Sequence, residues 1–383
     1  MSMVNNDNRG ETTTPAIRNV GWRTYRLPFR ERFSTSREAA TYRFGAIVEV
    51  SLETGVKGLG EVAPLPLSHP AALAAALEPA PALLAELTGQ SLDEALGNLE
   101  RYVESRSLPV SLICGVETAL LDALARQLGR RLSTLLASFK GPVKTAVPVN
   151  ALIGEISLSD SVDQAVEAAA AGFSCIKLKV GGRRRPEQDI ELVRAVRQAI
   201  GPDIALRLDA NGAWSFPEAT AVLSGCRAYD PQYVEEPLAS ALLHELPALR
   251  DRTGVPIALD EALADLSDVQ SILEGRYADV LVIKPQVVGG LRMSQKIIEA
   301  ASRRGIECVL TSSIESGIGV AAILQLAAAM PEVRLASGLA TLPLLADDLI
   351  LEQLPVRAGA ISTPAANGLG VWVDETALAR YGE

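Results

Sequence analysis

From about Lys144 onward, short apolar runs typical of β-strands alternate with stretches of helical periodicity, and this alternation restricts the fold more than any other feature. Helical patterns such as DIELVRAVRQAIG often end at a glycine, which can cap a helix. Eight strand-like runs over about 200 residues predict a (β/α) barrel rather than an open sheet. No GxGxxG motif follows the first run to indicate a dinucleotide-binding fold. The runs are AVPVNALI, CIKLKV, IALRLDA, QYVEEP, PIALDE, DVLVIKP, ECVLTSS and VRLAS.

The part of the chain before this alternation has a different pattern. Residues 18–62 alternate apolar and polar side chains in short runs, with Gly-containing turns, which is typical of antiparallel strands. Residues 71–139 are rich in Ala and Leu at helical spacing. Strands followed by helices predict a separate α+β domain. The last stretch, GLGVWVDETALARYG, has strand and turn character, and we expect it to return to the first domain.

Composition limits the partners that this chain can have. Lys and Arg number 36 against 46 Asp and Glu, and the formal net charge of −10 disfavours nucleic acid. No stretch reaches the roughly 20 continuous apolar residues that a membrane helix needs, so no membrane partner is expected. The polar residues 1–16 contain no apolar signal core and are predicted to be a disordered leader. We expect a cytoplasmic protein, and the sequence leaves homo-oligomer formation open.

Cysteine and histidine, frequent ligands of transition metals, are few and dispersed. The four cysteines lie far apart, so neither a zinc site nor a disulfide framework is indicated, and a reducing compartment fits. The two histidines, His69 and His244, have no candidate ligand or nucleophile nearby, and we expect surface or packing roles for them. Acid and base chemistry must therefore come mainly from lysines and carboxylates, and any metal must be held by oxygen ligands. The cysteines are Cys114, Cys175, Cys226 and Cys308.

Two lysines occupy one apolar run, CIKLKV. Residues two apart on a strand share a face, so Lys177 and Lys179 both point into the barrel if either does. Burying both is costly unless carboxylates or a metal-bound anion compensate, and the cost lowers a lysine pKa toward values at which it can act as a base. On its own, the motif is better explained by an edge strand whose lysines reach solvent. The runs that follow change this interpretation.

Carboxylates end the next three runs. Asp209, Glu235 and Asp260 are spaced about 25 residues apart, and Lys284 ends the run after them. The C-terminal ends of barrel strands converge on one face, so the three carboxylates would meet there. One such carboxylate is often a helix cap or an ion-pair partner, but three would repel one another unless a divalent cation lay among them. Hard oxygen ligands of this type predict Mg²⁺ or Mn²⁺.

Taken together, the motifs KLK, LDAN, VEEP, LDE and IKP resemble, in this order and spacing, those of the enolase superfamily and specifically its muconate-lactonizing-enzyme subgroup. The resemblance covers nearly the whole chain. It implies an α+β capping domain over residues 17–142, a modified TIM-type (β/α)7β barrel over residues 143–350, and a C-terminal return over residues 351–383 that packs on the capping domain.

The resemblance also implies roles for individual residues. Asp209, Glu235 and Asp260 would ligate the metal, and Lys179 and Lys284 would face the two sides of a small-molecule carboxylate substrate. Members of the superfamily share one step, the abstraction of a proton α to a carboxylate. A metal stabilises the resulting enediolate, which allows a weak carbon acid to react near neutral pH.

Within the subgroup, LTSSIESGIG (residues 310–319) and GLATLPLLADDL (residues 338–349) resemble the o-succinylbenzoate synthase family. That family dehydrates a succinyl-bearing cyclohexadiene carboxylate in menaquinone or phylloquinone synthesis. The resemblance implies that Lys179 removes the proton and returns it to the departing hydroxide, while Lys284 stays cationic. The backbone around the small residues would hold the succinyl carboxylate, although these residues also fit a tight turn. The residues expected at the substrate are Lys177, Arg207, Asn211, Ser312, Ser313 and Gly338.

Other activities remain open. An N-succinylamino acid racemase would use the same two lysines, and the sequence does not exclude it. Dipeptide epimerases resemble one another in an acidic DxD after the last barrel strand, where this chain has LASGLATL. Muconate cycloisomerisation is less favoured again. A non-catalytic barrel of this family should have lost a lysine or a ligand, and this chain keeps all of them.

Overall fold

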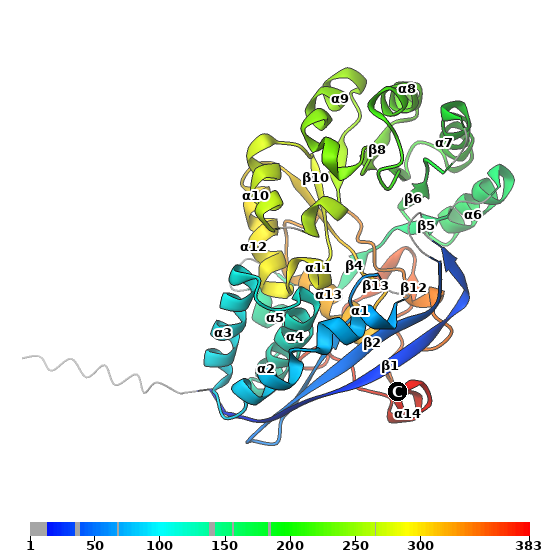
Figure 1. The fold of residues 1–383 in the computed structure, drawn as a ribbon. Coiled ribbons are helices and arrows are strands. Elements are labelled where there is room, and N and C mark those ends of the chain that lie inside the picture. Colours follow the sequence, from blue (N-terminus) through cyan, green and yellow to red (C-terminus); the bar gives the residue numbers. More distant parts are fainter. Residues whose placement is uncertain are drawn as a thin grey trace, which may run out of the picture.

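The computed structural model describes residues 14–34, 39–66, 69–137, 142–154, 157–182, 185–264 and 266–383. Figure 1 shows two parts: an antiparallel sheet with helices, and a curled parallel sheet surrounded by helices. The α+β capping domain and the barrel predicted from the sequence are therefore both present. The predicted leader, residues 1–16, lies for the most part outside the described residues. The predicted domain boundaries stay predictions.

The capping part is built on three antiparallel strands, β1 (Ile17–Ser34), β2 (Ala39–Leu52) and β3 (Lys57–Val62), in that order. The helices α1 and α2 lie against the sheet, and together they form the apolar stretch 70–87, with a mean hydropathy of 1.2. By length and composition alone this stretch would pass for a membrane helix, as some core helices of globular proteins do. The helices of the capping part, among the residues that the structure describes, are α1 (Pro70–Leu77), α2 (Ala80–Leu87), α3 (Leu92–Ser105), α4 (Val110–Gln127) and α5 (Leu132–Leu136).

Glycines allow β3 and α4 to approach each other closely. A Cβ atom on Gly58 would lie 2.1 Å from the carbonyl oxygen of Ala119, and one on Gly60 would lie 1.9 Å from that of Gly115. No larger residue fits at either position without moving the helix backbone. β3 continues into Ala63, whose N–H donates to Gln286 Oε1 of the barrel at 3.0 Å.

Within the described residues, the barrel contains seven parallel strands, and strands that follow each other in sequence are also neighbours in the sheet. The predicted run AVPVNALI divides into β4, which pairs with a C-terminal strand, and β5, which opens the barrel. The predicted eighth run, VRLAS, forms no extended strand, but single bridges join Ser337 to Val149 and Gly338 to Thr311 across the gap. β4 is Ala146–Pro148, and the barrel strands are β5 (Ala151–Ile153), β6 (Cys175–Lys179), β7 (Ala205–Asp209), β8 (Pro231–Glu235), β9 (Ile257–Leu259), β10 (Val280–Ile283) and β11 (Glu307–Leu310).

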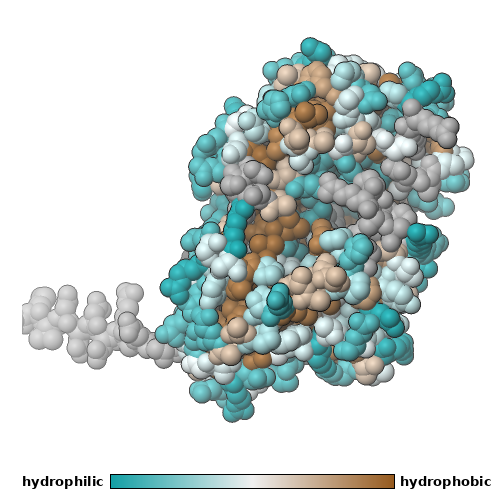
Figure 2. All heavy atoms as spheres, viewed as in Figure 1, coloured by the Kyte–Doolittle hydropathy of each residue, from teal (hydrophilic) through white to brown (hydrophobic). Residues whose placement is uncertain are grey.

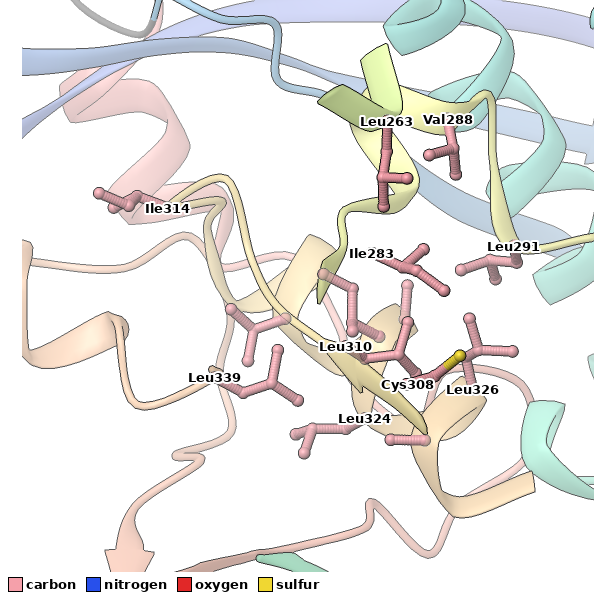
Figure 3. Close-up of a cluster of buried hydrophobic side chains, with 14 of the residues drawn as sticks. Leu263, Ile283, Val288, Leu291, Cys308, Leu310, Ile314, Leu324, Leu326 and Leu339 are labelled. Atoms are coloured by element: carbon pink, nitrogen blue, oxygen red, sulfur yellow. The ribbon is translucent and has the colours of Figure 1, made fainter. Parts of the chain in front are cut away.

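Helices between the strands cover the outside of the sheet (Figure 1). Strand alternation places Ile283 and Leu310 in the layer between sheet and helices, where Figure 3 shows them packed with Leu326. The opposite faces of the strands supply a separate apolar cluster that includes Tyr233, Val282 and Val309. The helices are α6 (Leu158–Ala170), α7 (Pro186–Ile200), α8 (Phe216–Cys226), α9 (Leu246–Thr253), α10 (Leu266–Gly275), α11 (Pro285–Val288), α12 (Leu291–Ser302) and α13 (Gly317–Ala329).

The C-terminal residues return to the capping part. The backbone N–H of Leu132 donates to the carbonyl of Gly368 at 2.8 Å, and Arg23 of β1 pairs with Glu375. The strands β12 (Val356–Arg357) and β13 (Ala360–Ser362) complete a small sheet with β4. The prediction of strand and turn character was wrong for residues 375–381, which form α14 (Glu375–Tyr381) because Asp374 caps the first N–H groups.

In the face shown in Figure 2, apolar residues gather between the upper and lower halves of the molecule, while most of the outer surface is hydrophilic.

Buried carboxylates connect the capping part to the barrel. Glu117 of α4 accepts hydrogen bonds from the backbone N–H groups of Leu291 at 2.7 Å and Arg292 at 3.2 Å, at the start of α12. Burial raises the pKa of Glu117 to about 7, although these donors oppose the shift.

Because the pKa of Glu117 is higher in the folded protein than in the unfolded chain, folding takes up a proton between these two values. Its contribution to stability is complete below about pH 4.5 and is lost as the pH rises through 7. We expect the unfolding free energy of the wild type to fall relative to Glu117→Gln in this window, by at most about 1.4 kcal/mol per pH unit. Denaturant unfolding across the window measures this difference.

The surface variant Glu375→Gln is the control, because its side chain pairs with Arg23 in solvent. It should not reproduce the decline. A difference between the wild type and Glu117→Gln that stays constant with pH would contradict the prediction.

Candidate active site

Parallel pairing aligns the predicted site residues at one edge of the barrel. In the register of the sheet, Lys179 lies opposite Asp209, and Asp209 lies opposite Glu235. Asp260 follows the last residue of β9, the next strand, and Lys284 follows β10. Five consecutive strands therefore end in the two lysines and three carboxylates that the sequence singled out.

The lysines of β6 point into the barrel, as strand alternation predicted. Lys177 Nζ lies 2.7 Å from Glu235 Oε1 and 2.8 Å from Asp209 Oδ2. Lys179 Nζ lies 2.7 Å from Asp209 Oδ2 and donates to Asn211 Oδ1 at 2.6 Å. The edge-strand interpretation is excluded, because the ammonium groups are held by buried carboxylates rather than by solvent.

At the far end of the row, Lys284 forms an ion pair with Asp260. The Lys284 side chain is 18% exposed and the Asp260 side chain 9%, so the pair lies at the barrel mouth but is largely withdrawn from water. Lys179 ends β6 and Lys284 follows β10. These two strands lie on either side of β7, β8 and β9, whose ends carry the three carboxylates. A small molecule over the carboxylates would therefore have one ammonium group on each side.

The charges perturb one another strongly. Burial and the neighbouring Asp209 raise the pKa of Glu235 to about 8. Burial alone would lower the pKa of Lys177, but Asp209 and Glu235 outweigh it and raise that pKa well above its usual value. Asp260 likewise raises the pKa of Lys284 against the effect of burial. The sequence-based expectation of a lowered lysine pKa therefore does not hold for Lys177, because it has two carboxylate partners.

Two further acids, Glu236 and Glu261, orient residues of the predicted site, and the sequence analysis gave neither of them a role. The backbone N–H groups of Asp260 and Ala262 both donate to Glu236 Oε1 at 3.0 Å. Asn211 Nδ2 donates to Glu261 Oε1 at 3.0 Å, which turns the amide oxygen of Asn211 toward Lys179. The sequence did contain a signal for these two residues, because VEEP and LDE each have two adjacent acids. The first acid of each pair is a predicted metal ligand, and the second binds another predicted site residue.

Arg207 lies two residues before Asp209 on β7 and is fully buried. Its guanidinium donates to Gln232 Oε1 at 2.8 Å and to the carbonyl of Ala336 at 2.8 Å, and it lies over the ring of Tyr233. The side chain thus sits one step deeper in the barrel than the carboxylate row. Its predicted contact with substrate stays a prediction.

The predicted substrate residues after β11 come together with Gly338. The N–H of Ser312 donates to the carbonyl of Gly338 at 3.1 Å, and the Ser312 and Thr341 hydroxyl groups lie 2.8 Å apart. A Cβ atom on Gly338 would lie 2.3 Å from Thr311 Oγ1, so glycine is required for this approach. Ser313 lies beside them and is also buried. Their role in binding substrate stays a prediction.

The donor set fits a hard divalent cation. Three carboxylates at adjacent strand ends provide oxygen ligands, and buried negative charges of this kind need compensating positive charge. Within the described part of the chain, each carboxylate currently faces a lysine, and no three of them converge on one point. Asp209, Glu235 and Asp260 are the side chains that would hold such an ion.

Family models match almost the entire chain. The model for the mandelate racemase / muconate lactonizing enzyme N-terminal domain matches residues 13–137, and the enolase C-terminal domain-like model matches residues 160–377. This chain belongs to the enolase superfamily, in its muconate-lactonizing-enzyme subgroup. Its relatives in that superfamily are enzymes, and so is this protein.

Individual members of the superfamily differ in activity but are similarly close. The chain is 38% identical to an o-succinylbenzoate synthase of Thermobifida fusca over 224 residues, which cover 56% of this chain and 68% of that protein. It is 29% identical to a hydrophobic dipeptide epimerase of Enterococcus faecalis over 365 residues, covering 93% and 99% of the two chains.

A solved structure supports the fold. A dipeptide epimerase from Cytophaga hutchinsonii, complexed with Mg and the dipeptide D-Ala-L-Val, superposes with a TM-score of 0.85 at 24% identity. The match covers 96% of this chain and 98% of that one. At this level of identity the comparison establishes the architecture of cap and barrel.

We predict that Asp260→Asn weakens Mg²⁺ binding by more than about tenfold, because the change removes an anionic oxygen from the ligand set. Calorimetric titration of the purified protein with Mg²⁺ measures this loss. Asp279→Asn is the matched control, since Asp279 precedes β10 at the opposite end of the barrel and accepts the N–H of Ile257. Equal affinity of wild type and Asp260→Asn would rule out Asp260 as a ligand.

Proposed function

We propose that the protein is an o-succinylbenzoate synthase, a lyase that eliminates water from 2-succinyl-6-hydroxy-2,4-cyclohexadiene-1-carboxylate. The observation that supports this most is the placement of Lys179 and Lys284 on either side of three buried carboxylates. That arrangement suits removal of a proton α to a carboxylate. The similarity to the Thermobifida fusca protein favours dehydration as the outcome.

In this proposal Lys179 removes the proton from the carbon α to the ring carboxylate. The electron pair released by that C–H bond forms the new ring double bond, and the C–O bond to the hydroxyl group breaks on the same face. The ammonium of Lys179 then returns the proton to the departing hydroxide, so that water leaves and the ring becomes aromatic. The base is restored in the same cycle, and no other reactant is needed.

The other residues hold charge in place during this step. Asn211, fixed by Glu261, accepts a hydrogen bond from Lys179 and orients its ammonium. Lys284 stays cationic because Asp260 raises its pKa, and it offsets negative charge that develops on the substrate. A Mg²⁺ or Mn²⁺ ion held by the three carboxylates would supply the main positive charge at the reacting carboxylate when bound. We also propose a role in menaquinone or phylloquinone synthesis and a cytoplasmic location.

A racemase or epimerase of the same subgroup is the second candidate. It is favoured by the same flanking lysines, which provide a base on each side of an α-carbon, and by the match to the Enterococcus faecalis epimerase over almost the whole chain. Residues 335–342 contain no acid that could bind the ammonium group of a dipeptide substrate, which argues against dipeptide epimerisation. An N-succinylamino acid lacks that group and is therefore the stronger alternative substrate.

Two assays run side by side distinguish these candidates. We expect the Mg²⁺-loaded protein to change the absorbance of the succinyl-cyclohexadiene carboxylate quickly as the aromatic product forms. Optical rotation of an N-succinylamino acid should change slowly or not at all. Fast racemisation without dehydration would overturn the proposed function and assign the protein to the racemase branch.

We predict that Lys179→Ala abolishes dehydration while leaving the fold and Mg²⁺ binding intact, because it removes the base but none of the carboxylates. Turnover, thermal unfolding and Mg²⁺ titration should be measured on the same preparation. Lys57→Ala is the control, since that lysine pairs with Glu49 on the surface of the capping part. Substantial turnover by Lys179→Ala would remove Lys179 from the role of base.

A further inference from the structure

The turn between β11 and α13, residues 312–316, holds an unfavourable backbone conformation. Ile314 has a φ of 60°, in the left-handed region, which a β-branched side chain adopts only when its surroundings enforce it. Figure 3 shows Ile314 on its loop at the edge of the buried apolar cluster that also contains Ile283 and Leu310.

Hydrogen bonds within the barrel fix part of the turn. The N–H of Ile314 donates to Ser312 Oγ at 3.2 Å, and the N–H of Ser313 donates to Glu315 Oε2 at 2.6 Å. With Ser312 bonded to Gly338, the first three N–H groups of the turn are all engaged by the protein itself. They are not available to bind a substrate carboxylate without a rearrangement. Among the described residues, the Ser313 hydroxyl is a buried donor of this turn with no partner.

The rest of the turn is held by the capping part. Arg43 of β2 is fully buried, and its Nε donates to the carbonyl of Ile314 at 3.0 Å. Its Nη1 donates to the carbonyls of Phe44 at 2.7 Å and Pro64 at 3.0 Å, which anchors the guanidinium in its own domain. The strained residue is thus clamped from the cap at its carbonyl and from the barrel at its N–H.

Glu61 of β3 secures the other end of the turn. Its carboxylate accepts the N–H of Ser316 at 2.9 Å, the hydroxyl of Ser316 at 2.6 Å and the N–H of Gly319 at 2.8 Å. Tyr25 of β1 also donates to it. The carboxylate therefore lies at the N-terminus of α13, where the helix dipole favours negative charge. Glu61 of the capping part thus binds donors at the start of α13, where Ser316 and Asp348 also accept backbone N–H groups.

The same strand reaches the loop that follows Lys284. Gln286 Nε2 donates to the backbone carbonyl of Glu61 at 2.7 Å, and the N–H of Ala63 donates back to Gln286 Oε1 at 3.0 Å. One strand of the cap thus contacts the loops after β10 and β11. These are the two loops next to the side of the site where Lys284 stands.

We propose that Arg43 and Glu61 are positioning residues for substrate specificity: they hold the strained turn 312–316 in the single conformation that presents Ser313 to the distal part of the substrate. This inference rests on the proposed function, in which that distal part is the succinyl carboxylate. Neither residue contacts the lysines or carboxylates of the site in the described structure. Their loss should therefore weaken recognition of the succinyl group more than the chemistry.

Arg43→Lys tests the inference, because lysine keeps the charge but lacks the fork that joins Ile314 to Phe44 and Pro64. Two substrates should be compared, the succinyl-cyclohexadiene carboxylate and its distal amide. We expect the wild type to prefer the acid by about tenfold or more in kcat/KM. In Arg43→Lys, KM for the acid should rise by about tenfold with kcat within about threefold, and the preference should largely disappear.

Hydrogen exchange of the turn adds a readout that needs no substrate. Exchange of the Ser316 and Gly319 amides should accelerate in Glu61→Gln, because the side-chain amide cannot accept all four hydrogen bonds that the carboxylate accepts. Arg23→Lys and Glu49→Gln are matched controls on the same sheet, both in surface ion pairs, and should leave exchange and kinetics unchanged.

The outcomes separate the two hypotheses. If the wild type does not dehydrate the acid, the proposed function fails, and the inference fails with it. If the wild type does so but Arg43→Lys keeps its KM and its preference for the acid, the inference alone is overturned. If Arg43→Lys does not fold, Ser316→Ala replaces it, since this change removes only one donor to Glu61. An unchanged KM for the acid in Ser316→Ala would then overturn the inference.

Discussion

The mutual neutralisation of lysines and carboxylates at the C-terminal edge of the barrel is the constraint on which the rest of the structure depends. The ammonium nitrogen of Lys177 lies within 2.8 Å of carboxylate oxygens of both Asp209 and Glu235. All three side chains are withdrawn from solvent, so an unpaired charge among them would be costly. The parallel register places these groups at the same level, so shifting one strand by a residue would turn its charge into the apolar layer outside the barrel. The fold and the site therefore specify each other.

This coupling explains why so much of the site could be predicted. Lys179, Asp209 and Glu235 are strand-end residues, and strand alternation with parallel pairing determines where their side chains point. The barrel and the α+β cap followed from periodicity for the same reason. Local errors arose where a pairing partner lies far away in sequence or where a helix N-cap was not recognised. The run before residue 151 joins β13 instead of the barrel, and Asp374 caps a helix that the apolar pattern did not indicate.

The supporting contacts of the site could not be predicted from patterns, because they depend on side chains that meet only in the folded protein. Glu236 binds the N–H of Asp260 across 24 residues, and Arg43 binds Ile314 across 271. Nothing in the local sequence of either donor or acceptor requires its partner. The sequence shows the paired acids at the strand ends. It does not show whether the second acid faces the metal, the substrate or the backbone, because that direction depends on the backbone φ angle at the residue. Glu236 has a φ of 42°, which turns it away from the row.

The positions of the buried carboxylates suggest why the capping part is fixed to the barrel. Glu61 and Glu117 each bind N–H groups at the start of a barrel helix, and each is buried between the two parts. Withdrawing the cap would take from both carboxylates the N–H donors that the barrel supplies, and this cost adds to the loss of apolar contact. Rigid attachment keeps the turn at Ile314 strained and ordered before substrate arrives. Specificity for the distal end of a substrate can then be set by residues that never touch it.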